Sequence, residues 1–166
     1  CLISFDPNLR LSLWKTPEEA RRRILYGMKQ CDIMKISEEE VAFVSEQESL
    51  EKGVSFIRDN SDIKILFVTL GNKGSIAYYK DEKIYCGGIH QEHVVDTTGA
   101  GDTFCGAVLS RILELGTDAL TEKDIREMLL FANAAASIVV TRKGALCSMP
   151  EPEEIRAASS LIDKVL

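Results

Sequence analysis

The sequence lacks the features that mark several classes of protein. It has no basic excess, since 20 Lys and Arg face 26 Asp and Glu, and the formal net charge is −6. A protein this acidic is a poor candidate for binding a nucleic-acid backbone, which requires a basic surface. The longest apolar run, residues 134–140, is far too short to cross a membrane. We also find no basic stretch followed by an apolar one, which is the pattern of a secretory leader. We therefore expect neither nucleic acid nor a membrane as a partner.

Paired cysteines and histidine clusters are also missing. The five cysteines are odd in number and form no C-x-x-C pair, which argues against a disulfide scaffold or a zinc site and favours a reducing, cytoplasmic location. We expect each to be a small buried or half-buried apolar residue. His90 and His93 have no third ligand nearby, so we expect them on a loop surface.

What is present fits one globular domain. The chain has 166 residues, 45% of them hydrophobic and 28% charged, which is enough for one substantial core. It does not begin with Met but with an apolar run over residues 2–5. We expect this run to be an interior strand of a longer parent's sheet, and residues 1–166 to be the C-terminal part of a single domain.

Strand-like and helix-like segments alternate along the chain. The first helix is predicted to begin near Thr16-Pro17, where Thr caps the helix and Pro fits its first turn. This alternation predicts an α/β sandwich on a mostly parallel sheet. The expected strands are residues 2–5, 32–36, 63–70, 75–80 and 83–86, and the expected helices are 16–29, 38–45, 49–59, 99–115, 122–140 and 153–166.

Residues 96–104, Asp-Thr-Thr-Gly-Ala-Gly-Asp-Thr-Phe, are the most informative segment. Glycines at the start of a helix leave backbone N–H groups open to an anion, at the positive end of the helix dipole. Asp102, directly after them, could accept the proton of an attacking hydroxyl in a phosphoryl transfer. Alternatively, Gly99 and Gly101 only shape a turn and Asp102 only occupies the helix start. No Gly-Lys-Ser/Thr follows, so this is not a Walker loop.

This segment resembles the second signature of the ribokinase-like (PfkB) sugar kinases. Four further segments resemble motifs of that family and follow one another in the same order as in the family. Residues 5–10 with 13–14 resemble its D-x-N-x-R region, and residues 35–40 resemble its Asn-x-x-Glu motif. Residues 69–75 resemble its T-x-G-x-x-G turn, and residues 133–145 resemble its terminal helix and loop. The fold implied is a ribokinase-like αβα sandwich with a mostly parallel central sheet, of which this chain is the C-terminal portion.

The resemblance also implies the site. Asp102 would be the general base, and Gly99, Ala100 and Gly101 the anion hole. Residues near ATP would be Asn8, Arg10, Ser37, Thr69, Gly71, Gly74 and Asn133. Glu40, with Ser37, would arrange Mg²⁺ through water; here the sequence departs from the family, because Ser37 replaces the commoner Asn. A K⁺ site would use Asp96 and Ser148 with the carbonyls of Thr98, Val139, Arg142 and Gly144.

The resemblance implies ATP-dependent phosphorylation of a sugar. Fructose is the first candidate for that sugar, because the segments at residues 6–10 and 35–40 resemble those of fructokinases. Ribokinase, 2-keto-3-deoxygluconate kinase and adenosine-type kinases remain alternatives, as does a non-catalytic fructokinase-like partner protein. The parent is a candidate homodimer. We expect residues 1–166 alone to be inactive, because most sugar-binding residues of this family lie in its N-terminal half, which this sequence does not include.

Overall fold

The structure is a computed structural model of the chain, and it describes residues 1–162. The chain is an α/β protein with a five-stranded sheet in the order β1-β2-β3-β4-β5. Two compact units can be distinguished, residues 1–70 with 77–82, and residues 71–76 with the chain from 83 onward. The boundary between them runs through strand β4 (Gly74–Tyr79).

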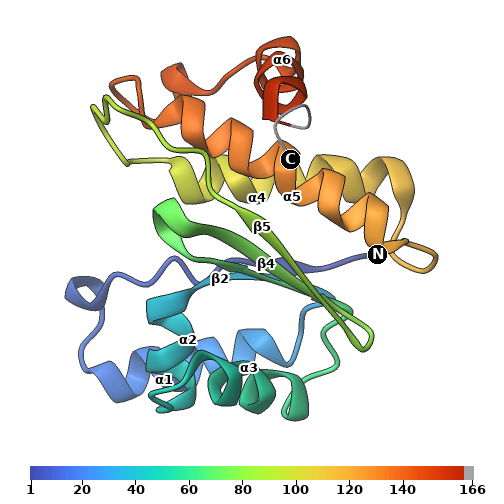
Figure 1. Cartoon of the computed structure of the whole chain (residues 1–166). Coiled ribbons are helices and arrows are strands. Elements are labelled where there is room, and N and C mark those ends of the chain that lie inside the picture. Colours follow the sequence, from blue (N-terminus) through green and yellow to red (C-terminus); the bar gives the residue numbers. More distant parts are fainter. Residues whose placement is uncertain (163–166) are drawn as a thin grey trace. The chain divides into compact units, whose positions relative to one another are not determined.

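The first unit carries the parallel part of the sheet. Strand β2 (Ile33–Ser37) lies between β1 (Ser4–Phe5) and β3 (Ile65–Thr69), parallel to both. Ser37 is paired with Thr69 at the carboxyl ends of their strands. Helices α1 (Pro17–Met28), α2 (Glu38–Ser45) and α3 (Leu50–Asp59) lie together on one side of these strands (Figure 1), and a short 3₁₀ helix, η1 (Leu11–Leu13), precedes α1.

The three helices begin where the sequence predicts, because each has a side chain that caps it. The hydroxyls of Thr16, Ser37 and Ser49 accept hydrogen bonds from backbone N–H groups three residues later. These bonds satisfy donors that have no partner inside the helix.

Strands β2 and β3 are buried over their first four residues. The fully buried apolar side chains here include Met34, Ile36 and Phe67. One buried side chain in β2 is charged, since Lys35 is only 6% exposed. Such a group requires a partner, and the partner of Lys35 is Asp6.

Strand β1 lies at one end of the sheet, and Leu2 and Ile3 before it are exposed. In this chain the segment is therefore an edge, which differs from the interior strand expected in a longer parent. That expectation stays a prediction about the parent.

The second unit contains residues 74–76 of β4, residues 83–87 of β5 (Glu82–Gly87) and the helices that follow (Figure 1). Helix α4 (Ala100–Leu115) packs on α5 (Glu122–Val139), which packs on α6 (Pro152–Ile162). Two 3₁₀ turns, η2 (Gly71–Lys73) and η3 (Leu146–Ser148), were not predicted. The predicted helix at residues 153–166 is confirmed as α6 as far as Ile162, and its last four residues lie outside the described part.

The exposure of two cysteines corrects the sequence predictions. Cys1 and Cys147 are exposed rather than buried or half-buried. Within residues 1–162, no helix is long and apolar enough to cross a membrane.

Candidate active site

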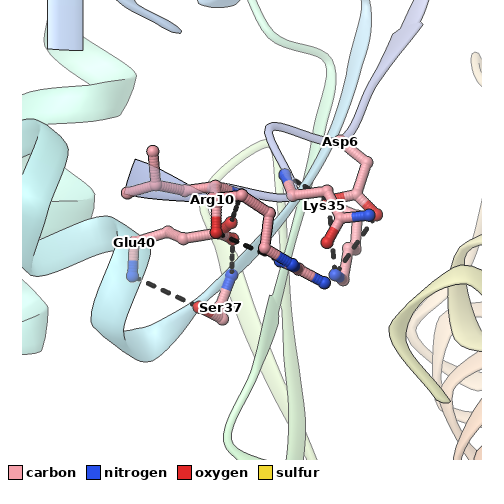
Figure 2. Close-up of polar contacts among 7 residues, drawn as sticks. Asp6, Arg10, Lys35, Ser37 and Glu40 are labelled. Carbon is pink, nitrogen blue, oxygen red and sulfur yellow. Dashed lines mark hydrogen bonds and ion pairs between the residues drawn. The ribbon is translucent and has the colours of Figure 1, made fainter. Parts of the chain in front are cut away.

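In the first unit, a cleft of about 410 Å³ lies beside the carboxyl end of β2 and the start of α2. Several residues predicted to lie near ATP or Mg²⁺ line it together: Asn8, Arg10, Ser37 and Glu40. Lys35 lines it as well. Figure 2 shows Arg10, Lys35, Ser37 and Glu40 together with Asp6, which pairs with Lys35.

Glu40 joins two segments of the chain at this cleft. Its Oε2 atom accepts the backbone N–H of Ser37 at 2.9 Å, which completes a capping box at the start of α2. Its Oε1 atom accepts the backbone N–H of Leu9 at 2.6 Å. The buried carboxylate therefore holds the segment that carries Asn8 and Arg10 against the start of α2 (Figure 2).

Lys35 and Asp6 hold the other end of that segment. The Nζ atom of Lys35 lies 3.3 Å from Oδ1 and 3.2 Å from Oδ2 of Asp6, and both side chains are largely buried. Oδ1 of Asp6 also accepts the backbone N–H of Asn8 at 3.2 Å. Burial raises the pKa of Asp6 above its usual value, although the neighbouring Lys35 acts in the opposite direction and Glu40 adds to the rise.

Lys35 is a site residue that the sequence analysis missed. A signal was present, because a lysine inside an apolar strand is almost never buried without a partner. The sequence alone offers both Asp6 and Asp32 as acidic partners. In the structure Asp32 pairs with Lys64 instead, at 3.3 Å.

The predicted nucleotide turn follows β3. Thr69 ends β3 beside Ser37, and Gly71 and Gly74 both have positive φ, 60° and 110°. A Cβ on Gly74 would lie 2.2 Å from the carbonyl oxygen of Cys86, so no other residue fits there without a backbone shift.

Asn133, predicted near adenine or ribose, is buried in the second unit. Its Oδ1 accepts the Ser75 hydroxyl at 2.9 Å, and its Nδ2 donates to the carbonyls of Cys86 and Gly87 at 3.2 and 3.1 Å. The side chain therefore fastens α5 to the ends of β4 and β5. Its contact with a nucleotide stays a prediction.

The Gly99–Asp102 segment opens helix α4 as predicted. Gly99 is the N-cap with φ 84°, and its carbonyl accepts the N–H of Thr103 at 2.8 Å. Ala100, Gly101 and Asp102 form the first turn, where backbone N–H groups lack intrahelical acceptors and the dipole favours negative charge. Asp102 is exposed, so its carboxylate can reach a bound molecule.

Three of the predicted K⁺ residues, Thr98, Gly144 and Ser148, are linked to Asp96 by hydrogen bonds. Its Oδ1 accepts the N–H of Thr98 at 2.9 Å and its Oδ2 accepts the N–H of Gly144 at 3.2 Å. Hydrogen bonds from Thr98 and Gly144 lower the pKa of Asp96. The Ser148 hydroxyl donates to the Gly144 carbonyl.

Val139 and Arg142, the other two residues predicted to hold K⁺, make hydrogen bonds or ion pairs with residues near them in the chain. The Val139 carbonyl accepts the N–H of Arg142 at 3.0 Å, and the Arg142 side chain pairs with Glu154. A Cβ on Gly99 would lie 3.2 Å from Ala145. The loop before α4 is therefore in direct contact with the loop that follows α5, in which Ala145 lies.

The two ions fit these residues differently. No group of three or more His, Cys, Asp or Glu side chains within residues 1–162 could hold a metal ion, and both oxygens of Glu40 already accept backbone N–H groups. Each of these oxygens keeps a lone pair, so the predicted contact of Glu40 with Mg²⁺ through water is open. The atoms predicted to hold K⁺ are all oxygens, the type of ligand that suits an alkali cation, and both oxygens of Asp96 likewise accept backbone N–H groups.

The glycine turn and Asp102 at the start of α4 belong to the segment that resembles the second signature of the ribokinase-like sugar kinases. Residues 2–152 match the pfkB family of carbohydrate kinases, and the chain belongs to that family.

Among individual relatives, Fructokinase-1 of Oryza sativa is 42% identical over 156 residues, which cover 93% of this chain and 47% of the relative. A fructokinase double mutant from Vibrio cholerae O395, solved in its fructose, ADP and potassium ion bound form, is 33% identical with a TM-score of 0.84, over 94% of this chain and 49% of that one. An E. coli chain described as a ribokinase II, in complex with ATP and Mg²⁺, is 31% identical with a TM-score of 0.79, over 96% and 49%. The fold is thus ribokinase-like, and the chain spans about half the length of the relatives it matches.

Proposed function

We propose that the protein transfers the γ-phosphoryl group of ATP to a hydroxyl of a sugar, and that the sugar is fructose, giving fructose 6-phosphate and ADP. The observation that carries this proposal is the 42% identity to a fructokinase over 93% of the chain. The Gly99–Asp102 turn supports it, because it places a carboxylate and the first backbone N–H groups of a helix together.

Asp102 acts as the general base in this proposal. Its carboxylate takes the proton of the sugar hydroxyl, the hydroxyl oxygen forms a bond to the γ-phosphorus, and the bond from that phosphorus to the β,γ-bridging oxygen breaks. The N–H groups of the Gly99–Gly101 turn stabilise the negative charge on the transferred group. Exposure of Asp102 and its position in the first turn of α4 support this role.

The cleft of the first unit holds the nucleotide phosphates. Arg10 offers a planar set of donors that suits phosphate oxygens, and Asn8 and Ser37 line the same cleft. Thr69, Gly71 and Gly74 border the rest of the nucleotide, and Asn133 holds the strands beside them.

Mg²⁺ would neutralise charge on the phosphates, and Glu40 contacts it only through water. The oxygens around Asp96 hold K⁺ beside the turn that opens α4. We further propose that residues 1–166 form part of one kinase domain, in a cytoplasmic protein that binds neither nucleic acid nor membranes.

The test is ADP release by the purified intact protein with fructose, ribose, 2-keto-3-deoxygluconate or adenosine as acceptor. We expect the highest kcat/KM with fructose. ADP release only with another acceptor would overturn fructose as the substrate, and no release with any of them would favour a non-catalytic partner protein.

A further inference from the structure

The five-residue segment Asp6–Arg10 is held by two carboxylates, the half-buried one of its own Asp6 and the buried one of Glu40. Asp6, fixed by Lys35, accepts the N–H of Asn8. Glu40, fixed by Ser37, accepts the N–H of Leu9. We call this arrangement, Lys35–Asp6 and Glu40, the carboxylate clamp.

The segment includes an uncommon backbone conformation. Asn8 has a φ of 42°, in the left-handed region, which asparagine adopts more often than other non-glycine residues but less readily than extended or helical conformations. The two bonded amides, on Asn8 and Leu9, immediately precede Arg10. Arg10 is exposed and lines the cleft, and its side chain is hydrogen-bonded to the carbonyl of Leu9 at 3.1 Å. The direction of Arg10 therefore depends on the backbone that the clamp holds.

We propose that Lys35 and Glu40 are positioning residues, which act through the backbone of Asn8 and Leu9 to direct Arg10 at the nucleotide phosphates. This inference rests on the proposed function for the identity of the ligand. It gives Glu40 a role that needs no metal, through the hydrogen bonds that its carboxylate accepts from Leu9 and Ser37. It also gives a reason for a buried ion pair, which is costly to desolvate.

The first experiment separates the backbone role of Glu40 from a metal role. In the intact protein, Glu40→Gln replaces one acceptor by a donor, so one of the two backbone amides loses its partner. We expect the Kd for ATP measured in EDTA, without Mg²⁺, to rise by about tenfold. If ATP affinity falls only when Mg²⁺ is present, Glu40 acts through the metal and the inference is overturned.

The second experiment tests whether Lys35 acts through Asp6. Lys35→Met keeps the apolar bulk of the side chain and leaves a carboxyl that can take up a proton, so it is gentler than stranding a buried ammonium. We expect ATP affinity in EDTA to fall by about tenfold, and the double variant with Asp6→Asn to be no weaker than Lys35→Met alone. Additive effects would mean that Lys35 contacts the phosphates itself, and would overturn the proposal.

Lys64→Met is the matched control. Lys64 pairs with Asp32 at 3.3 Å, at the opposite end of strand β2 and in a more exposed position. We expect this variant to bind ATP as the wild type does. If ATP affinity falls as much in Lys64→Met as in Lys35→Met, then removing any ion pair from this unit weakens binding. That result would contradict the carboxylate clamp.

Hydrogen exchange of the Asn8 and Leu9 amides gives a readout that does not depend on nucleotide. We expect faster exchange at Asn8 in Lys35→Met and at Leu9 or Ser37 in Glu40→Gln, with thermal unfolding confirming that each variant folds. Unchanged exchange contradicts the clamp. A wild-type protein with protected amides but no ATP binding would contradict the proposed function while leaving the clamp in place.

Discussion

The backbone N–H of Gly144 donates a hydrogen bond to Oδ2 of Asp96, 48 residues earlier, at 3.2 Å. The other oxygen of the same carboxylate accepts the N–H of Thr98. One ionised side chain thus ties the loop that leads to α4 to the loop that follows α5, within the second unit. The charged form of Asp96 is the form that makes these bonds best.

A dependence of stability on pH follows from this arrangement. The pKa of Asp96 is lowered below its usual 3.8 in the folded protein, so its contribution to stability is complete above that value and is lost as the pH falls through the folded pKa. We expect Asp96→Asn to lower the urea midpoint at pH 7, and the wild-type and variant midpoints to converge as the pH falls below 3.8. A difference that stays constant down to pH 2.5 would contradict this account.

Replacement of the proposed base separates chemistry from binding. In the intact protein, Asp102→Asn is expected to lower kcat by about 100-fold or more and to leave the Kd for ATP within a few-fold, because a base acts in the transition state. Glu114→Gln, which removes an exposed carboxylate further along α4, serves as the control and should keep its activity. An Asp102→Asn enzyme with more than about a tenth of wild-type kcat would rule out this base.

Two glycines of the α4 region should respond to alanine with opposite signs. Gly99→Ala places a side chain at a φ of 84° and against Ala145, which we expect to destabilise the protein by about 1–2 kcal/mol. Gly106, inside α4, has no atom within 4 Å of an added Cβ, so Gly106→Ala should stabilise by about 0.5–1 kcal/mol. Urea unfolding measures both, and equal shifts in one direction would contradict the argument.

Potassium should activate the enzyme if the oxygens around Asp96 hold it. Replacing K⁺ with tetramethylammonium at constant ionic strength is expected to reduce turnover, because the large organic cation cannot enter a cage of oxygens. Turnover that is equal in the two salts would show that no alkali cation takes part.

The sequence by itself determined the elements of this protein and the family to which it belongs. Helix starts at Thr16, Ser37 and Ser49 were predictable because a cap involves residues three positions apart. The strands were predictable from short apolar runs, and the start of α4 from the glycines before Asp102. These signals are local, and each is complete within a few residues of the chain.

Only the tertiary structure decided how the site residues are held. Glu40 meets Leu9 across 31 residues, and Asn133 meets Ser75 across 58. Lys35 needed an acidic partner, but composition and spacing do not tell Asp6 from Asp32. That choice depends on which strand ends the folded chain brings together, because a hydrogen bond or an ion pair forms only at short range in space, whatever the separation along the sequence.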